Sequence, residues 1–359
     1  MQELEDYYAE LVFWEIRGKK FYNKMQALDT IIEKKLDWQE LKFHFFDQAF
    51  KKYDWKQNLQ SSFEELMKQR ALQLRNRYDY LRLWYSGGPD SHTMLQPFIE
   101  NKIHIDEIIS YRCSVSNNPM SETNREINDS ALPYLETIKS LFPKTKFTVL
   151  DIGRDHYFDF FRNHFWTRTT NILRFRPYCR KYFYKWFPEL LAPKQKGMSH
   201  VNIIGKDKPR ITFANNKWYW LMYDGMVASF VGAPFVEYFF ISDQLPALHH
   251  AQCLLVKSYL ETFHDGKSSV DHLFREADLS WLNRLCRTPV HRPVMFEKTG
   301  EIVSPKANAA VLEGETYAPE ILGLFKAPLI YENGHDTWRF NQDSIFNDLK
   351  GTRTDLYEI

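Results

Sequence analysis

The chain has 359 residues, of which 44% are hydrophobic and 16% aromatic, so it can bury a sizeable core and is not disordered over most of its length. Its 47 Lys and Arg residues nearly balance its 46 Asp and Glu residues, which excludes binding of nucleic acid through overall positive charge. The length predicts one large domain with extensions rather than a string of modules.

The first 77 residues carry apolar side chains at helical spacing, such as Leu28, Ile31 and Ile32, among Lys and Glu residues. This pattern predicts a helical N-terminal extension over residues 1–77. At Tyr80 the pattern changes to a short predicted strand over residues 80–85, followed by a segment rich in glycine. A helix is predicted over residues 92–100, which Pro97 is expected to kink or shorten.

Four more strands are predicted over residues 107–113, 147–151, 200–205 and 235–241, with helices over residues 121–141 and 246–263. Strands that alternate with helices indicate an α/β fold with a mainly parallel, doubly wound sheet. We expect this domain to span residues 78–263. Residues 264–359 are expected to form an irregular C-terminal extension, with a hairpin around Thr299 and Gly300.

A glycine-rich motif, Ser86-Gly87-Gly88-Pro89-Asp90-Ser91, lies where the first predicted strand of this domain meets its first helix, the place where α/β sheets bind ligands. Two glycines allow the backbone to approach an anion closely, and the N–H groups at a helix N-terminus attract it. Ser86 and Ser91 add hydroxyl donors, and Asp90 is an oxygen ligand suited to Mg²⁺. The alternative is a Gly-Gly-Pro turn that only links strand to helix.

The dinucleotide fingerprint G-x-G-x-x-G and the Walker motif G-x-x-x-x-G-K-[ST] are both absent from the sequence. A Rossmann oxidoreductase and a P-loop kinase are therefore excluded.

The motif resembles the PP-loop of the N-type ATP pyrophosphatases, a superfamily that includes the synthetase domain of asparagine synthetase and phosphoadenosine phosphosulfate reductase. The resemblance covers about residues 78–260. It implies an adenine nucleotide alpha-hydrolase-like fold that uses ATP and Mg²⁺. In the family, a substrate oxygen attacks the α-phosphate, which gives an adenylated intermediate and pyrophosphate. By resemblance, Ser86, Gly87, Gly88, Asp90 and Ser91 would bind the pyrophosphate, and Asp90 would hold the metal and assist catalysis.

Other positions follow from matching strand ends to the family. The segment after the second predicted strand of the domain would place Tyr111 and Ser114 against the adenosine. The segment after the fourth resembles the family's second phosphate-side loop. In it, Lys206 would bind the nucleotide, Asp207 would hold metal, and Lys208 and Arg210 would neutralise charge at the α-phosphate. The alternative is a solvated charged turn.

A basic aromatic segment over residues 160–188 holds seven Arg and Lys residues, no Asp or Glu, and many aromatic rings. Arginine beside stacking rings suits single-stranded nucleic acid or an anionic small substrate. The same side chains also lie along apolar helix faces with their charges in solvent. The near-zero net charge favours an anionic substrate over nucleic acid.

The four cysteines, Cys113, Cys179, Cys253 and Cys286, lie far apart with no C-x-x-C pair, which argues against a zinc ribbon, a redox motif or a disulfide framework. This pattern favours the reducing cytoplasm. The N-terminal residues do not follow the signal-peptide pattern, and no apolar run reaches about 18 residues, so neither secretion nor a membrane partner is predicted. His92 follows the motif directly and is a candidate for contact with phosphate or substrate, or for a place on the helix surface.

The leading hypothesis is an ATP-dependent adenylating enzyme, similar to ligases and amidotransferases, that activates a carboxylate, amide or carbonyl oxygen. Amide or C–N bond formation is the expected result, and a partner protein that supplies the nucleophile is left open. One alternative is an enzyme similar to phosphoadenosine phosphosulfate reductase or a sulfur-transferring enzyme. Another is a module that binds nucleotide or nucleic acid without catalysis.

Overall fold

The computed structural model of the protein describes residues 11–22, 24–113, 117–120, 124–156, 159, 183–205, 210–214, 217–222, 235–262 and 354–359. Its strands are β1 Val12–Ile16, β2 Lys19–Phe21, β3 Leu41–Phe45, β4 Tyr80–Trp84, β5 Glu107–Cys113, β6 Lys146–Ile152, β7 His200–Ile204, β8 Arg210–Ala214, β9 Lys217–Leu221, β10 Val236–Tyr238 and β11 Tyr357–Glu358.

Its α-helices are α2 Lys24–Lys34, α3 Asp47–Phe50, α4 Phe63–Arg77, α5 Pro89–Glu100, α6 Leu132–Ile138, α8 Phe183–Trp186, α9 Ala192–Gln195 and α11 Pro246–Thr262. Short 3₁₀ turns are η1 Trp38–Glu40, η4 Lys139–Leu141 and η7 Pro188–Leu191, and a π turn, η3, spans Ile127–Ala131.

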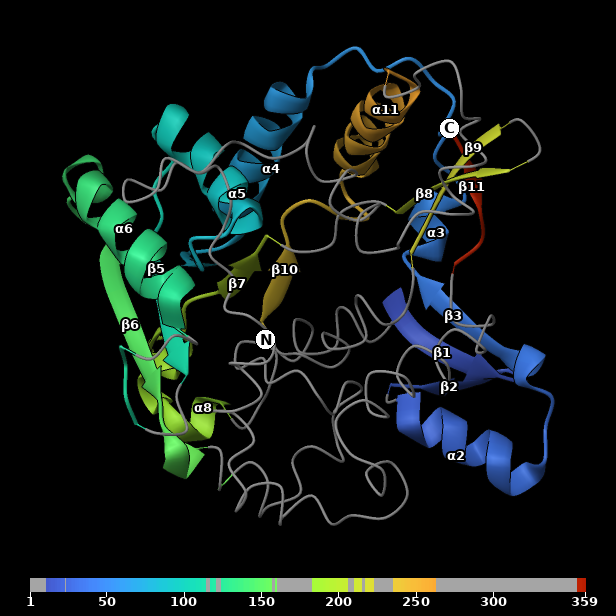
Figure 1. The fold of residues 1–359 in the computed structure, drawn as a ribbon, viewed down its shortest axis with the longest axis horizontal. Helices are drawn as coiled ribbons and strands as arrows, with labels where there is room; N and C mark the ends of the chain where they lie inside the picture. Colours follow the sequence, from blue (N-terminus) through green and yellow to red (C-terminus); the bar gives the residue numbers. More distant parts are fainter. Residues whose placement is uncertain are drawn as a thin grey trace.

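The central sheet has five parallel strands in the order β10-β7-β4-β5-β6. The chain builds outward from β4 to β5 and β6, then returns to the other side of β4 to add β7 and β10. Right-handed crossovers then place helices on both faces, and the order reverses between β4 and β7. Helices α4, α5 and α11 lie together on one side (Figure 1). The predicted α/β fold with a doubly wound sheet is confirmed.

The five predicted strands of this sheet all form, because each is a short run rich in β-branched, aromatic or leucine side chains. Helix α5 begins at Pro89 and continues past Pro97 to Glu100 without a break. A proline so close to the end of a helix removes one hydrogen bond, and burial of Met94, Leu95 and Phe98 compensates for that loss. The predicted helix over residues 121–141 is confirmed over its described residues, which are helical without a break from residue 124 to residue 141 and include the π turn η3, helix α6 and the 3₁₀ turn η4.

The prediction of a wholly helical N-terminal extension is wrong. Strands β1, β2 and β3 form an antiparallel sheet with the order β2-β1-β3, in which Trp14 pairs with both Phe21 and Phe43. Burial alternates along β1, where Val12, Trp14 and Ile16 are buried and the residues between them are half-buried. Because the half-buried residues include the aromatic Phe13, the sequence does not show the alternation of apolar and polar residues that is typical of a strand. Only α2 and α4 keep the predicted helical character over many residues.

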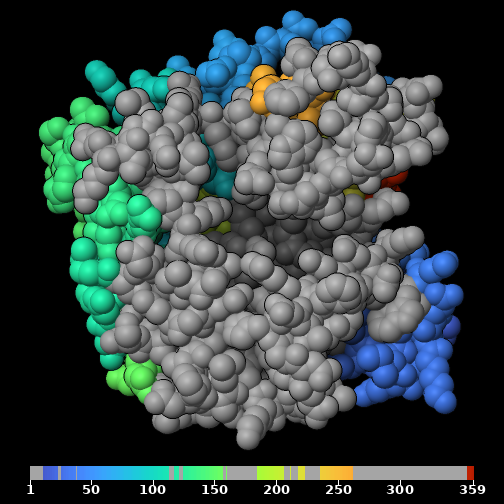
Figure 2. Space-filling view, in the orientation of Figure 1, coloured from blue at the N-terminus to red at the C-terminus, as the bar shows by residue number. Residues whose placement is uncertain are grey.

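A third sheet was not predicted. Strands β8, β9 and β11 pair antiparallel in the order β11-β9-β8, and Tyr357 lies opposite Trp220. Trp220 packs among Phe50, Trp55 and Tyr357, so the N-terminal region and the last described strand share one aromatic cluster. Figure 2 shows the N-terminal sheet, in blue, and the β5–α6–β6 region, in green, at opposite sides of the molecule.

Several predicted features lie outside the described residues, namely most of the C-terminal extension, its hairpin near Thr299, and residues 160–182 of the basic aromatic segment. Within the described part of the chain, no helix has the length and apolar character needed to cross a membrane.

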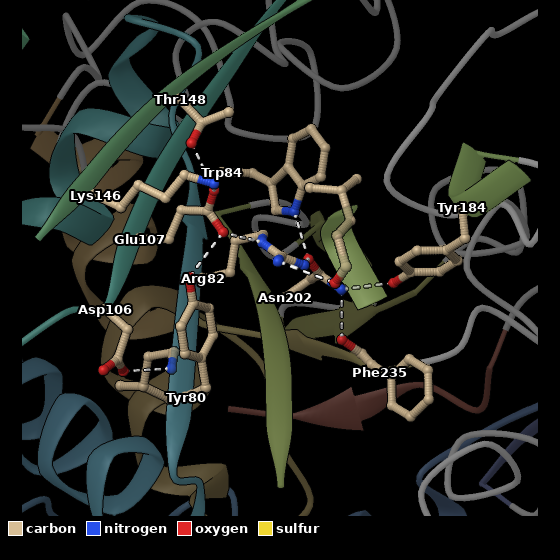
Figure 3. Close-up of polar contacts among 12 residues, drawn as sticks. Tyr80, Arg82, Trp84, Asp106, Glu107, Lys146, Thr148, Tyr184, Asn202 and Phe235 are labelled. Carbon is tan, nitrogen blue, oxygen red and sulfur yellow. Dashed lines mark hydrogen bonds and ion pairs between the residues drawn. The ribbon is translucent and has the colours of Figure 1, made fainter. Parts of the chain in front are cut away.

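A buried polar network ties the central strands together (Figure 3). Arg82 of β4 donates to Glu107 of β5 at 2.7 Å, and both side chains are almost fully buried. Tyr80 and Thr148 also donate to Glu107. Burial alone would raise the pKa of Glu107, but the Arg82 charge, the hydrogen bonds from Thr148 and Arg82, and the Lys146 charge lower it below its usual range. The carboxylate therefore stays ionised in the core.

Asn202 of β7 extends this network across the sheet. Its amide oxygen accepts from Trp84 Nε1 at 2.9 Å, and its amide nitrogen donates to Tyr184 Oη and to the Phe235 carbonyl. Arg82 also donates to the Leu190 carbonyl of η7. The segment that precedes β7 is thus fixed by buried hydrogen bonds to the sheet.

Removing one member of the buried pair should be costly. We expect Arg82→Leu to lower the free energy of unfolding by about 3–5 kcal/mol, because Glu107 would lose its compensating charge. Urea unfolding measures this change. The matched control is Arg17→Leu, which breaks the exposed pair with Glu40 and should change stability far less, because solvent screens both charges. Equal losses of stability in the two variants would contradict the stabilising role assigned to the buried pair of Arg82 and Glu107.

Acid should destabilise the protein well before its carboxylates titrate. Burial lowers the pKa of both His200 and His250 to about 4, and the Arg82 charge adds to the effect on His200. These imidazoles stay neutral in the folded chain while they protonate in the unfolded chain near pH 6.5. Stability is therefore full above pH 6.5 and falls as the pH drops toward 4, by up to on the order of 3 kcal/mol for each histidine.

Chemical unfolding at pH 7, 6 and 5 tests this expectation. The double variant His200→Gln/His250→Gln should show a much flatter dependence over the same range. A wild-type stability that stays constant from pH 7 to 5 would rule out the expected contribution of both imidazoles.

Candidate functional site

The glycine-rich loop over residues 86–91 joins β4 to α5 at the carboxyl edge of the central sheet. It lies beside the point between β4 and β7 where the strand order reverses, which is where open α/β sheets form their ligand crevice. The chain leaving β7 touches this loop, since a Cβ atom added to Gly205 would lie 2.7 Å from the Asp90 carbonyl oxygen. Strand ends more than a hundred residues apart thus meet here.

Hydroxyl groups within the loop fix its shape. Ser91 Oγ donates to the Gly88 carbonyl at 3.0 Å and accepts from the Ser86 N–H at 3.1 Å. Ser86 Oγ lies 3.2 Å from Ser91 Oγ. Gly88 is the N-cap of α5 in extended conformation, so the first turn of the helix starts directly after it. The two serines predicted to bind phosphate therefore form and brace the loop itself.

Gly87 is in the left-handed region, with φ of 78°. A Cβ atom here would lie 2.7 Å from the Ala131 N atom and 2.9 Å from the Glu126 carbonyl oxygen. Ser130 Oγ also donates to the Gly87 carbonyl at 3.0 Å. Both the backbone conformation and the close approach of η3 require glycine at this position.

Gly88 faces a side chain rather than a backbone. A Cβ atom on Gly88 would lie 2.3 Å from Glu126 Oε1, so the Glu126 carboxylate lies directly over the loop. Glu126 precedes the π turn η3, whose hydrogen bond runs from the Leu132 N–H to the Ile127 carbonyl. The segment after β5 is therefore the immediate neighbour of the loop.

A cavity of about 300 Å³ opens at the carboxyl ends of β5 and β6, on the same edge of the sheet. Its lining includes Arg112, Asn124, Asp151 and His156. Arg112 makes a bidentate pair with Asp151 at 2.7 and 2.9 Å. Asn124 lies two residues before Glu126, so a single segment borders both the cavity and the loop.

His156 is a neutral member of this cavity at pH 7, because burial lowers its pKa. Its Nδ1 accepts from the Gly153 N–H at 3.1 Å, and its ring stacks on Phe187 with centroids 5.3 Å apart. The proton of the neutral imidazole is therefore on Nε2.

The structure brings together some of the predicted site residues. Ser86, Gly87, Gly88, Asp90 and Ser91 form one loop. Tyr111 contacts the Trp84 ring, and its neighbour Arg112, not Tyr111, lines the cavity. Arg210 begins β8, where its backbone pairs with Leu221. Ser114, Lys206, Asp207 and Lys208 lie outside the described residues.

His92 is buried rather than on the helix surface. Its Nδ1 lies 3.1 Å from the Tyr85 hydroxyl, and its Nε2 lies 3.1 Å from Gln96 Nε2. These contacts hold the start of α5 beneath the loop. Within the described residues, no group of three or more His, Cys, Asp or Glu side chains is arranged to hold a metal ion.

Sequence reasoning missed Glu126, Ser130 and Ala131 as neighbours of the loop. They lie in a predicted helix, and they contact residues about forty positions earlier in the chain. The one available signal was Gly87 itself, because a glycine in a tight turn can mark a place where another segment approaches the backbone closely, without identifying that segment.

The fold and this loop define an α/β protein with a candidate anion-binding site at the reversal point of a doubly wound sheet. No protein-family model matches the sequence, and no curated protein matches it.

Among solved structures, the chain is similar to NMN synthetase from Francisella tularensis, with 13% identity, a TM-score of 0.32, and coverage of 76% of this chain and 99% of that one. It is also similar to the NH3-dependent NAD synthetase from Campylobacter jejuni subsp. jejuni, in complex with the nitrate ion, with 11% identity, a TM-score of 0.30, and coverage of 63% and 92%.

The two glycines should respond differently to an added methyl group. We expect Gly87→Ala to lower the free energy of unfolding by about 2 kcal/mol or more, from left-handed strain and the clash with the Ala131 backbone. Gly88→Ala should cost less than Gly87→Ala, because its nearest neighbour is the end of the Glu126 side chain rather than backbone and because Gly88 is not in the left-handed region. Urea unfolding measures the free energy of unfolding of both variants. A larger loss of stability in Gly88→Ala than in Gly87→Ala would contradict the described packing.

Proposed function

We propose that the chain is an ATP-dependent adenylating enzyme of the PP-loop class. The observation that carries the proposal is the loop over residues 86–91, with left-handed Gly87 and N-cap Gly88, at the start of α5 beside the reversal of strand order. The N–H groups in the first turn of a helix have no partner within the helix, and the helix dipole adds partial positive charge there. This arrangement suits the pyrophosphate portion of ATP.

The cavity at the ends of β5 and β6 supports a place for the nucleoside. It lies one strand away from the loop, and Asn124 and Glu126 link the two places through one short segment. Its carboxylate and amide groups suit the hydroxyls of a ribose, since those oxygens accept hydrogen bonds from hydroxyl groups. In this proposal Arg112 and Asp151, already paired, form one wall of the nucleoside pocket.

The chemistry assigned to the site is attack of a substrate oxygen on the α-phosphorus of ATP. The bond between the α-phosphorus and the bridging oxygen breaks, and pyrophosphate leaves with the electron pair. The loop would hold the leaving pyrophosphate, and a nucleophile would then displace AMP, with amide or C–N bond formation as the net result. Lys206, Lys208 and Arg210 remain proposed as the cations near the α-phosphate, and Tyr111 and Ser114 as neighbours of the adenosine.

The residues at the loop fit a magnesium ion that accompanies ATP. Mg²⁺ is held by one or two carboxylates together with substrate phosphates, and Asp90 lies in the first turn of α5 next to the loop. When bound, the ion would neutralise phosphate charge. Asp90 would orient it, and Asp207 remains proposed as a second ligand.

Among the alternatives, a reductase or sulfur-transferring enzyme requires a reactive cysteine. Cys253 is fully buried in α11, which disfavours it as a nucleophile. A nucleophile-donating partner, an anionic substrate held by residues 160–188, nucleic acid at the same segment and a cytoplasmic location all remain proposals.

Phosphorus NMR of the protein with ATP, Mg²⁺ and a small-molecule extract of its host cell tests the proposed reaction. We expect AMP and pyrophosphate to form, and Asp90→Ala to lower their formation at least about 100-fold, because the charge beside the phosphates would be lost. Gly88→Val should abolish nucleotide binding, since its branched side chain fills the space over the loop. The matched control is Asp29→Ala, an exposed carboxylate on α2, which should leave turnover unchanged. Formation of ADP and phosphate, or full turnover in Asp90→Ala, would contradict the proposal.

A further inference from the structure

Residues 354–359 lie along β9 in the manner of a bound extended peptide. Strand β11 pairs antiparallel with β9 (Figure 1). The Ile359 N–H donates to the Trp218 carbonyl at 3.0 Å, and the Thr354 N–H donates to the Met222 carbonyl at 3.0 Å. When a sheet edge binds a peptide, hydrogen bonds of this kind give affinity, and pockets for side chains give specificity. The backbone of this segment is therefore held at both ends.

Tyr357 is the anchor of the segment. Only 7% of this residue is exposed, and its ring stacks on Trp220 with the two centroids 4.6 Å apart. The rings of Trp55 and Phe50 lie 5.6 and 6.3 Å from the Tyr357 ring. The neighbouring Leu356, by contrast, is 42% exposed. Because side chains alternate along a strand, the pocket selects an aromatic residue at one position of the segment.

The rim of this groove is basic, and the segment is acidic. Glu358 Oε2 lies 3.0 Å from Lys56 Nζ and 3.1 Å from Lys217 Nζ, and hydrogen bonds from both lysines lower the pKa of Glu358. Asp355 Oδ2 lies 3.0 Å from Lys51 Nζ. The lysines that contact the segment are Lys51, Lys56, Lys217 and Lys257. Charge complementarity therefore adds to the backbone pairing and to the aromatic anchor.

The groove and its occupant come from separate parts of the sequence. The segment after α3 provides Lys51 and Trp55, β9 provides Trp220, and α11 provides Lys257. These positions all precede residue 258, whereas the occupant spans residues 354–359. The relation between the two is that of a binding site and a tethered ligand.

We propose that this groove is a recognition site for extended peptides with the pattern acidic-x-aromatic-acidic, and that residues 354–359 occupy it as an exchangeable ligand. The inference does not rest on the proposed function, because the groove contains no residue of the loop over residues 86–91 or of the cavity. A ligand tethered to its own site has a high effective concentration, so a free peptide must compete with it. Weakening the tethered segment should therefore open the groove to the same peptide added from solution.

Fluorescence anisotropy with a peptide of the sequence of residues 354–359, labelled at its N-terminus, tests this expectation on full-length protein. Tyr357→Ala removes the anchor, and Glu358→Lys replaces attraction to two lysines by repulsion. We expect the peptide to bind each variant at least about tenfold more tightly than the wild type, because the tethered competitor is weakened. Glu358→Lys leaves the aromatic pocket intact, so it carries the test if Tyr357→Ala does not fold.

Changes in the peptide and in the groove test the recognition itself. Peptides that carry Tyr357→Ala or Glu358→Lys should each bind the Glu358→Lys protein about tenfold more weakly than the unchanged peptide, at low ionic strength. Adding Lys217→Glu to that protein should weaken binding of the unchanged peptide. The matched control is the addition of Lys34→Glu, an exposed lysine on α2, which should leave binding unchanged.

Unfolding curves confirm that each variant is folded. Equal peptide binding, or none, by the wild type and folded Glu358→Lys overturns the inference, and so does equal binding of the three peptides. A wild-type dimer that dissociates when peptide is added in excess supports the groove, with the segment supplied by a second copy of the chain.

Discussion

The buried ion pair between Arg82 and Glu107 is the constraint on which the rest of the sheet depends. Two opposite charges in a core are tolerated only when every remaining donor and acceptor is satisfied. Glu107 meets this requirement through Tyr80 and Thr148, and Arg82 through the Leu190 carbonyl. These partners come from β4, β6 and η7. A slip of any of these strands by one residue would leave a buried charge alone, so the network fixes the register on which the carboxyl edge of the sheet is built.

That register determines where the loop lies. The Tyr85 N–H donates to the Ile109 carbonyl, and Ser110 Oγ donates to the Tyr85 carbonyl, so β5 holds the end of β4 directly before residue 86. From there the two glycines turn the chain into α5 against the π turn. The ends of three neighbouring strands, together with the segment that holds the π turn, therefore position the site. The cavity beside β6 belongs to the same edge and needs no separate element to position it.

Sequence reasoning located the sheet and the loop well because their signals are local. Residues 107–113 are a strand in the sequence pattern and in the structure, and the Gly-Gly-Pro motif follows a strand in both. The N-terminal strands were missed because Phe13 is half-buried beside buried Trp14, which hides the alternation. In the third sheet, strand β11 was missed because Tyr357 finds its partner, Trp220, more than a hundred residues away in the chain. Glu126 was missed for the same kind of reason, since nothing near it in the chain indicates that Gly88 is its neighbour.

The π turn at η3 has a consequence for how this segment can diverge. In an α-helix, residues five positions apart differ by about 140° around the axis, so Glu126 and Ala131 would face different directions. The wider turn, closed by the bond from Leu132 to Ile127, brings both onto the loop. Deleting a single residue from this turn would close it as an ordinary α-turn, in which the two positions that contact the loop would lie four residues apart and differ by about 40° around the axis. Both positions would then still face the loop, so the π turn is the place where this segment holds one additional residue, and a one-residue deletion here should disturb the loop less than a deletion elsewhere in the helix.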